Sequence, residues 1–311
     1  MRLTRRALPL LATPALAQSR TLRIVVPFPP GGSTDILARR LAERLAPALG
    51  QTVVVENRPG AGGTTGADHV SKSAPDGQTL LLGVTGSNAI AQSLYANLPY
   101  DTVRGFAPVS RLVSAPLVLC VHPGLPARDV AGYIAAARAG AVTYATPGNG
   151  TSMHLTGVMF AQAAGVELTH VPYRGSAQLL IDLVAGTVAS AFADLLVVLP
   201  QIRANAVRAL AVTSAERHPL LPEVPTVAQS LPGFQAASWQ GLFAPPGTSA
   251  PVLERLHAEV ARAMQAEEIR EFFARQGFTV EATTPADFAA FVASETARWA
   301  AVVRAGNVRL D

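Results

Sequence analysis

Apolar runs alternate with glycine-rich turns along the first ninety residues. The continuous run at residues 22–26 is typical of a strand buried on both faces, and leucine then recurs every fourth residue from Leu37 to Leu45, as on one face of a helix. Apolar runs at 52–56 and 79–84 are each followed by a turn rich in glycine or small polar residues. Strands that alternate with helices in this way predict an open parallel α/β sheet.

A second series of the same kind follows. Its strands are expected at 142–146, 167–171, 188–194 and 207–212. Between the two series, residues 106–121 form two apolar runs broken at 114–116, long enough to carry the chain from one domain into another. A proline-rich stretch at 217–233 leads to a short strand at 238–246 that would return the chain to the first sheet. Helices predicted from residue 251 onward would pack on that sheet.

The turn at residues 27–35, Pro-Phe-Pro-Pro-Gly-Gly-Ser-Thr-Asp, joins the first strand to the first helix. Its prolines stiffen the backbone, its glycines allow close approach, and its last three residues suit a helix start. A helix start presents free N–H groups and the positive end of the dipole to an anion. The turn at 147–154 repeats this order, so we predict two anion-binding loops, one in each series.

The N-terminal segment has the composition of a signal peptide. Arg2, Arg5 and Arg6 precede a short apolar stretch that ends in Ala15-Leu16-Ala17, which predicts cleavage after Ala17 and export to the periplasm. The arginine pair also suits the twin-arginine route. Without these three arginines the formal charge falls from +4 to about +1, and aromatic residues make up only 6% of the chain. We therefore expect no nucleic-acid partner.

Neither a cofactor nor a metal is predicted. Cys120 is the only cysteine, and the six histidines show no spacing typical of a metal site. The glycine turn at 57–66 misses the dinucleotide pattern, because Thr65 stands where a third glycine is needed. No glycine turn is followed by the Gly-Lys-Ser/Thr of a phosphate-binding loop.

A hydrolase is the first enzyme class to consider, because Ser152, His154 and Asp194 are available. The chain has no Gly-x-Ser-x-Gly motif, and side chains two residues apart at a helix start point away from each other. We therefore expect no catalytic residues and favour a binding protein. Arg174 suits either a ligand contact or a solvated turn, and Asp194 either a ligand contact or a hinge.

Five segments, taken together and in order, resemble the Bug family of extracytoplasmic solute receptors, which serve transporters of the tripartite tricarboxylate type. They are residues 24–35, 55–63, 74–77, 172–175 and 241–245. The resemblance covers essentially the whole mature chain. It implies a type II periplasmic binding-protein fold with two open-sheet α/β domains and a ligand cleft between them. We place domain 1 at 18–116 plus 240–311 and domain 2 at 117–239.

The same resemblance implies that the two loops hold a ligand carboxylate largely by main chain and water. The residues expected to bind or surround the ligand are Phe28, Pro29, Pro30, Gly31, Gly32, Asp35, Thr85, Ser87, Asn88, Gly150, Thr151, Ser152, Tyr173, Arg174 and Asp194. Thr64-Thr65 and Gln78 depart from the family pattern. Gly31→Val is expected to abolish binding by blocking the approach of the backbone to the ligand, while the protein stays folded.

The resulting hypothesis is a monomeric periplasmic receptor that delivers a small carboxylate to the membrane components of such a transporter. The ligand classes are dicarboxylates or tricarboxylates, acidic amino acids and aromatic acids. The alternative is a ligand-loaded sensor that acts on a signalling partner.

Overall fold

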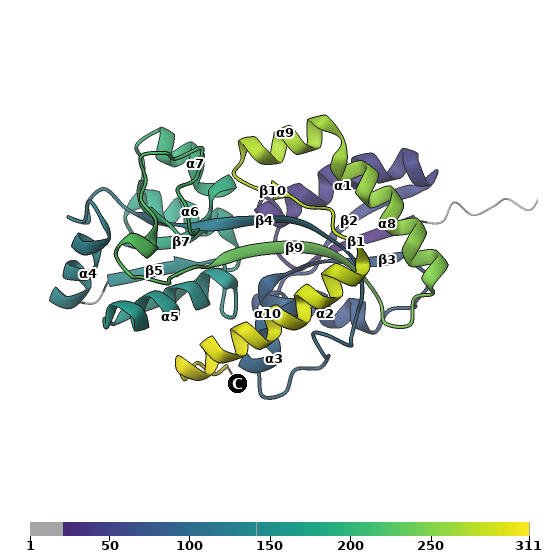
Figure 1. The fold of residues 1–311 in the computed structure, drawn as a ribbon, viewed down its shortest axis with the longest axis horizontal. Coiled ribbons are helices and arrows are strands. Elements are labelled where there is room, and N and C mark those ends of the chain that lie inside the picture. The colour runs from purple at the N-terminus through teal and green to yellow at the C-terminus, as the bar shows by residue number, and fades with distance from the viewer. Residues whose placement is uncertain (1–20, 141, 311) are drawn as a thin grey trace, which may run out of the picture.

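The computed structural model describes residues 21–140 and 142–310, which form two α/β lobes joined by two long strands (Figure 1). The predicted signal peptide, residues 1–17, lies outside the described residues. The predicted α/β fold with two open-sheet lobes is confirmed.

The first lobe is built on three parallel strands in the order β2 (Thr52–Asn57), β1 (Thr21–Val26) and β3 (Thr79–Val84). Alternate residues of β1 face opposite sides of this sheet, and both sides are buried. Helix α1 (Ser33–Leu49) covers one side and α2 (Thr64–Ser71) the other. This is why the first strand reads as a continuous apolar run.

The segment after β3 differs from the prediction of a polar turn. A π-helical turn, η2 (Gly86–Ile90), continues into α3 (Ala91–Leu94). Ile90 and Leu94 are buried in one cluster with Trp299 near the C-terminus. Burial against the distant segment that contains Trp299 thus decides a conformation that the local polar residues did not indicate.

The second lobe repeats the arrangement with the parallel strands β7 (Ser190–Asp194), β5 (Val142–Thr146) and β6 (Leu168–Pro172). An antiparallel strand, β8 (Arg208–Val212), pairs with β4. The helices of this lobe are α4 (Val130–Ala139), α5 (Ser152–Ala164), α6 (Ser176–Ala185) and α7 (Leu195–Arg203). The proline-rich stretch contains one short 3-10 turn, η3 (Val227–Gln229).

Two long strands, β4 (Ala107–Val121) and β9 (Ala237–Ala244), connect the lobes. Strand β4 is continuous, so the predicted break at 114–116 is wrong. It pairs with β9 as far as Pro116 and with β7 from Leu117 onward. The partner strand therefore changes where we place the boundary between the domains, a division that stays a prediction.

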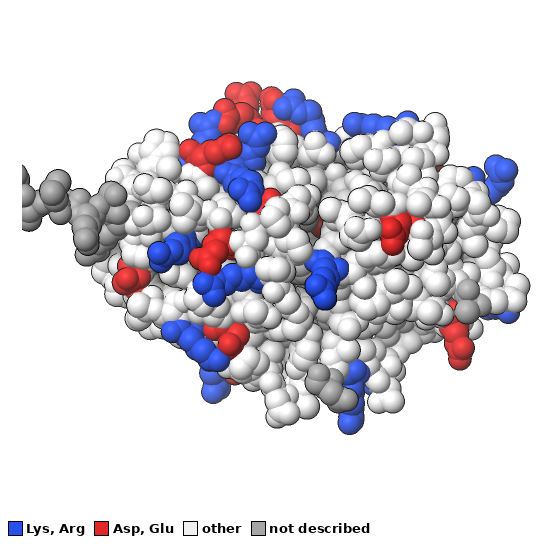
Figure 2. Space-filling model, turned by 180° about the vertical axis from the view of Figure 1, so that it is seen from behind, with Lys and Arg blue, Asp and Glu red and all other residues white. Residues whose placement is uncertain are grey.

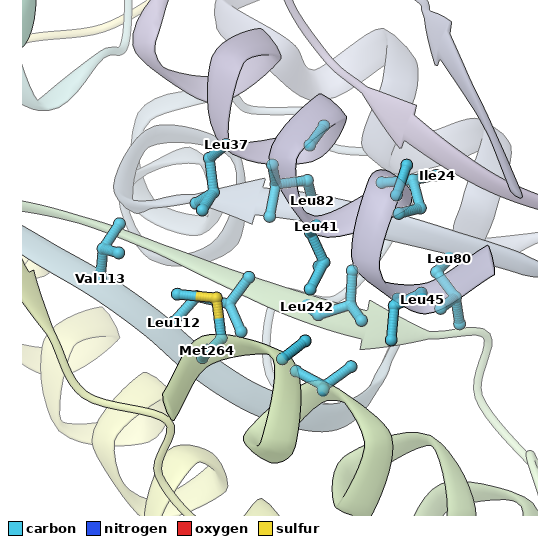
Figure 3. Packing of buried hydrophobic residues seen from close by; sticks show 14 of the residues in the cluster. Ile24, Leu37, Leu41, Leu45, Leu80, Leu82, Leu112, Val113, Leu242 and Met264 are labelled. Carbon is cyan, nitrogen blue, oxygen red and sulfur yellow. The ribbon is translucent and has the colours of Figure 1, made fainter. Parts of the chain in front are cut away.

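The C-terminal helices cover the first sheet, as predicted. Helices α8 (Ala250–Gln265) and α9 (Glu267–Arg275) contribute to the same cluster as α1, and Figure 3 shows Met264 beside Leu112 and near Leu41. Helix α10 (Pro285–Ala305) packs on the opposite side through Phe288 and Trp299. The short strand β10 (Thr279–Val280) pairs with β4.

The surface carries acidic and basic side chains in mixed groups. On the face shown in Figure 2 they gather mainly over the first lobe, with both signs interspersed. Within the described chain, no helix has both the length and the apolar character needed to cross a membrane.

Candidate ligand-binding site

A cavity of about 260 Å³ lies between the lobes, where four helices begin. The N-cap residues of α1, α5, α6 and α7 all line it: Gly32, Thr151, Gly175 and Asp194. Gly32 and Gly175 have no side chain to cap the first N–H groups of their helices. Unpaired N–H groups and the dipoles of α1, α5 and α6 make this part of the cavity favourable for an anion.

The loop before α1 is shaped by Asp35, whose carboxylate turns into the protein. It accepts hydrogen bonds from the Gly31 N–H at 3.0 Å and from Arg39 and Asn57 at 2.9 Å. Asn57 also donates to the Phe28 carbonyl at 2.9 Å. Burial raises the pKa of Asp35, but these hydrogen bonds outweigh it and leave the pKa below its usual value. Asp35 thus positions the loop and does not line the cavity.

Two stacked histidines help to position the loop before α5. His154 and His170 have ring centroids 4.0 Å apart, and burial lowers their pKa values to about 4 and about 3. The Gly150 N–H donates to Nδ1 of His154 at 3.2 Å. The His154 N–H in turn donates to the Thr151 hydroxyl at 3.3 Å, so an anion at the start of α5 would meet the N–H groups that lie between these two.

The two lobes approach each other closely beside the cavity at two glycines. A Cβ at Gly86 would lie 2.8 Å from the Gly150 carbonyl oxygen, and one at Gly62 would clash with the carbonyl oxygen of Asn149. Gly62 belongs to the turn η1 (Ala61–Gly63), the glycine-rich segment whose role the sequence left undefined. Because only hydrogen fits at these positions, the structure represents a closed arrangement of the lobes.

Asp194 is the acidic group of the cavity. It is 3% exposed, and its Oδ2 accepts a hydrogen bond from the Ser33 hydroxyl at 2.6 Å. Burial raises the pKa of Asp194 to about 6, although the bond from Ser33 acts in the opposite direction. Arg174 lines the same cavity from the turn before α6.

The structure brings about half of the predicted ligand-binding residues to the cavity wall. These are Phe28, Pro29, Pro30, Gly32, Thr151, Ser152, Arg174 and Asp194. Whether they contact a ligand stays a prediction.

The other predicted residues lie beside or behind the described wall: Gly31, Asp35, Thr85, Ser87, Asn88, Gly150 and Tyr173. Internal hydrogen bonds explain several of these positions. Thr85 Oγ1 accepts from the Trp239 N–H at 2.9 Å, the Ser87 hydroxyl donates to Asn88 at 2.7 Å, and the Tyr173 hydroxyl donates to Asp182 at 2.7 Å. Gly31 has a φ of +91°, so Gly31→Val would strain the backbone of the loop, and the expected block of ligand binding stays a prediction.

Other wall residues were missed by sequence reasoning. Ser33 and Gln240 reach the wall from α1 and β9, and Ser176 and Gln178 from the start of α6. Ser33 was recognised only as part of a helix start. Gln240 gave no local signal, because its place depends on the pairing of β9 with β3.

The hydrolase alternative has no support in this geometry. The Ser152 hydroxyl contacts the sulfur of Met153 at 3.3 Å, Nδ1 of His154 is occupied by Gly150, and Asp194 pairs with Ser33. The three candidate side chains are thus not arranged as a triad.

The family model of the "Tripartite tricarboxylate transporter family receptor" matches residues 37–308. The chain belongs to this receptor family. Its members include periplasmic binding proteins, so the chain is a solute-binding receptor of the Bug type, and its relatives are binding proteins rather than enzymes.

Three solved structures illustrate the likeness. The periplasmic binding protein BugD is 35% identical, with a TM-score of 0.88 over 93% of this chain and 98% of its own. The R. palustris protein Rpa4515, solved with adipate, is 35% identical, with a TM-score of 0.90 over 94% and 99%. MatC from Rhodopseudomonas palustris, solved with malate, is 34% identical, with a TM-score of 0.88 over 92% and 99%.

Proposed function

We propose that this receptor closes on a small carboxylate in the periplasm and delivers it to the membrane components of a tripartite tricarboxylate-type transporter. The observation that carries the proposal is the convergence of the starts of α1, α5 and α6 on one cavity between the lobes. Such helix starts bind carboxylates through main-chain N–H groups. The adipate and malate of the two Rhodopseudomonas structures agree with this class of ligand.

The ligand class is tested by thermal unfolding against dicarboxylates, tricarboxylates, acidic amino acids and aromatic acids. A ligand present at a hundredfold excess over its Kd stabilises the fold by about 2.7 kcal/mol. A shift with neutral solutes but with no carboxylate would refute the proposal. Transport is tested separately by uptake of the bound solute in cells that lack the receptor gene.

The main-chain site is tested by Gly32→Val. Gly32 has φ and ψ of −84° and 172°, which valine adopts, and a Cβ there would have only the Ser176 hydroxyl within 4 Å. The valine would cover the start of α1 without disturbing the backbone. We expect carboxylate binding to be lost while the melting temperature without ligand is kept. Gly140→Val, at an open glycine outside the cavity, is the matched control.

We also propose that the receptor is a monomer of two domains, residues 18–116 plus 240–311 and residues 117–239, which rotate about β4 and β9. The change of partner strand after Pro116 supports this division. Ligand-dependent small-angle scattering tests both the mass and the closure. Sequencing of the mature N-terminus tests export with cleavage after Ala17.

A further inference from the structure

A chain of hydrogen bonds links three side chains in the wall of the cavity. Gln240 donates from Nε2 to the Ser33 hydroxyl at 3.2 Å, and that hydroxyl donates to Oδ2 of Asp194 at 2.6 Å. The three residues are 2%, 6% and 3% exposed and come from β9, α1 and the end of β7. This chain of hydrogen bonds is therefore buried and connects the two lobes.

The donor and acceptor roles in these hydrogen bonds follow from the single proton of a serine hydroxyl. Since Ser33 gives its proton to Asp194, it can only accept from Gln240, which fixes the side-chain amide with its nitrogen toward Ser33. Oε1 of Gln240 and Oδ1 of Asp194 are left as acceptors, and both are buried without a hydrogen-bond partner among the described residues. Both residues line the cavity, so the contents of the cavity are the nearest source of donors for these two acceptors.

The charge of the wall narrows the choice of donor. Arg174 and Asp194 are the charged residues of this wall, and within the described chain Asp194 forms no salt bridge with Arg174 or any other residue. A second carboxylate placed beside Asp194 would add like charge, and the two carboxyl groups would have to share a proton. An ammonium group brings several protons and a positive charge.

We infer that the solute carries a primary amino group besides its carboxylate, and that Asp194 and Gln240 select it through this group. The inference rests on the proposed function, because it assigns the other end of a ligand whose carboxylate meets the helix starts. A hydroxyl group, which supplies one proton and no charge, satisfies the site only in part. A site built around buried acceptors rejects analogues that leave them unpaired.

Matched series of ligands test the inference by isothermal titration calorimetry. One series is succinate, malate and aspartate; another is 3-phenylpropionate, phenyllactate and phenylalanine; a third pair is adipate and 2-aminoadipate. Within whichever series binds, we expect the amino compound to bind at least about tenfold more tightly than the unsubstituted acid. Equal or tighter binding of the unsubstituted acid would overturn the inference and leave the receptor function standing. Absence of binding by every carboxylate would overturn both.

Two variants test the named residues. Asp194→Asn keeps the size of the side chain but removes its charge, and Gln240→Met keeps its length but removes the acceptor. Each should reduce or abolish the preference for the amino compound, with the unsubstituted acid affected less. Asp129→Asn removes a carboxylate of the same lobe at the N-cap of α4, where asparagine also caps, and should leave the preference intact. A preference that survives both cavity variants would overturn the assignment.

Discussion

The hydroxyl of Ser33 lies 2.6 Å from Oδ2 of Asp194, a residue 161 positions later in the chain and in the other lobe. This bond satisfies one carboxylate oxygen and leaves the other buried without a partner in the described protein. The carboxyl group is therefore poorly solvated, and burial raises its pKa to about 6. A group so placed reduces the stability of the ligand-free fold.

Asp194→Asn is expected to stabilise the ligand-free receptor at pH 7.5. The pKa of Asp194 in the fold lies above the ordinary value of about 3.9. Between these two pH values the folded state thus binds more protons than the unfolded chain. The fold therefore loses stability as pH rises through about 4 to 6. Removing the charge should raise the free energy of unfolding at pH 7.5 by on the order of 2 kcal/mol.

Urea unfolding at pH 7.5 and pH 4 measures this effect, and the gain should largely vanish at pH 4. Asp129→Asn serves again as the control. A variant that is less stable than the wild type at pH 7.5 would show that Asp194 stabilises the closed lobes instead.

Gly86→Ala is expected to hinder closure. The added Cβ would lie 2.8 Å from the Gly150 carbonyl oxygen of the opposite lobe, a contact that real Cβ atoms essentially never make. In the open state the methyl group has no such neighbour, so the overall stability should change little. We expect the affinity for the solute to fall roughly tenfold, which corresponds to about 1.4 kcal/mol.

Small-angle scattering with and without ligand reports the closure directly, and calorimetry reports the affinity. Gly140→Ala, at an open glycine of the second lobe, provides the comparison. Unchanged affinity in Gly86→Ala would mean that the lobes of the ligand-bound receptor lie farther apart than this close contact requires.

Sequence patterns predicted those features that depend on neighbouring residues. The strand, glycine turn and helix repeats around residues 27–35 and 147–154 are local, and the structure places both turns at one cavity. The orientation of Asp35 was not predictable in this way, because it depends on Asn57 at the end of another strand. A first-turn acid can face a ligand or cap its own loop, and only the tertiary partner decides which.

The position of Gln240 also depends on a distant part of the chain. Its amide reaches Ser33 across 207 positions of sequence, through the register of β9 against β3 and β4. The helical turn after β3 was missed for a related reason, since burial of Ile90 and Leu94 against α10 overrides a polar local sequence. Long-range strand pairing therefore places wall residues such as Gln240, whereas the local sequence pattern determines the two loops.

Asp35→Asn should loosen the first loop. The carboxylate accepts from the Gly31 N–H, Arg39 and Asn57, and the amide can accept at only one oxygen. We expect a loss of about 1–3 kcal/mol in the free energy of unfolding at pH 7. Because the pKa of Asp35 is lowered in the fold, this stabilisation is present above about pH 4 and is lost as pH falls further.

Chemical unfolding at pH 7 and pH 3 tests this prediction, since the gap between wild type and variant should narrow at pH 3. Glu43→Gln, whose partner Arg40 lies 3.5 Å away on the surface of the same helix, is the control and should have little effect. A gap of equal size at both pH values would assign the loss to packing rather than to the charge.

The stacked pair of His154 and His170 should make the second lobe sensitive to acid. Burial lowers their pKa values to about 4 and about 3, below the ordinary value of about 6.5. The unfolded chain therefore binds more protons than the fold in this window, and stability falls as pH drops from about 6.5 toward 4. For His154 alone the loss amounts to roughly 3 kcal/mol.

The double variant His154→Asn and His170→Gln removes both titrating rings and keeps an acceptor for the Gly150 N–H. Its free energy of unfolding should change less than that of the wild type between pH 6.5 and pH 4. At pH 8 both histidines are neutral in the folded and unfolded chains, so a difference there measures packing alone. Parallel pH profiles for the two proteins would show that the pair is already protonated or solvated in the folded receptor.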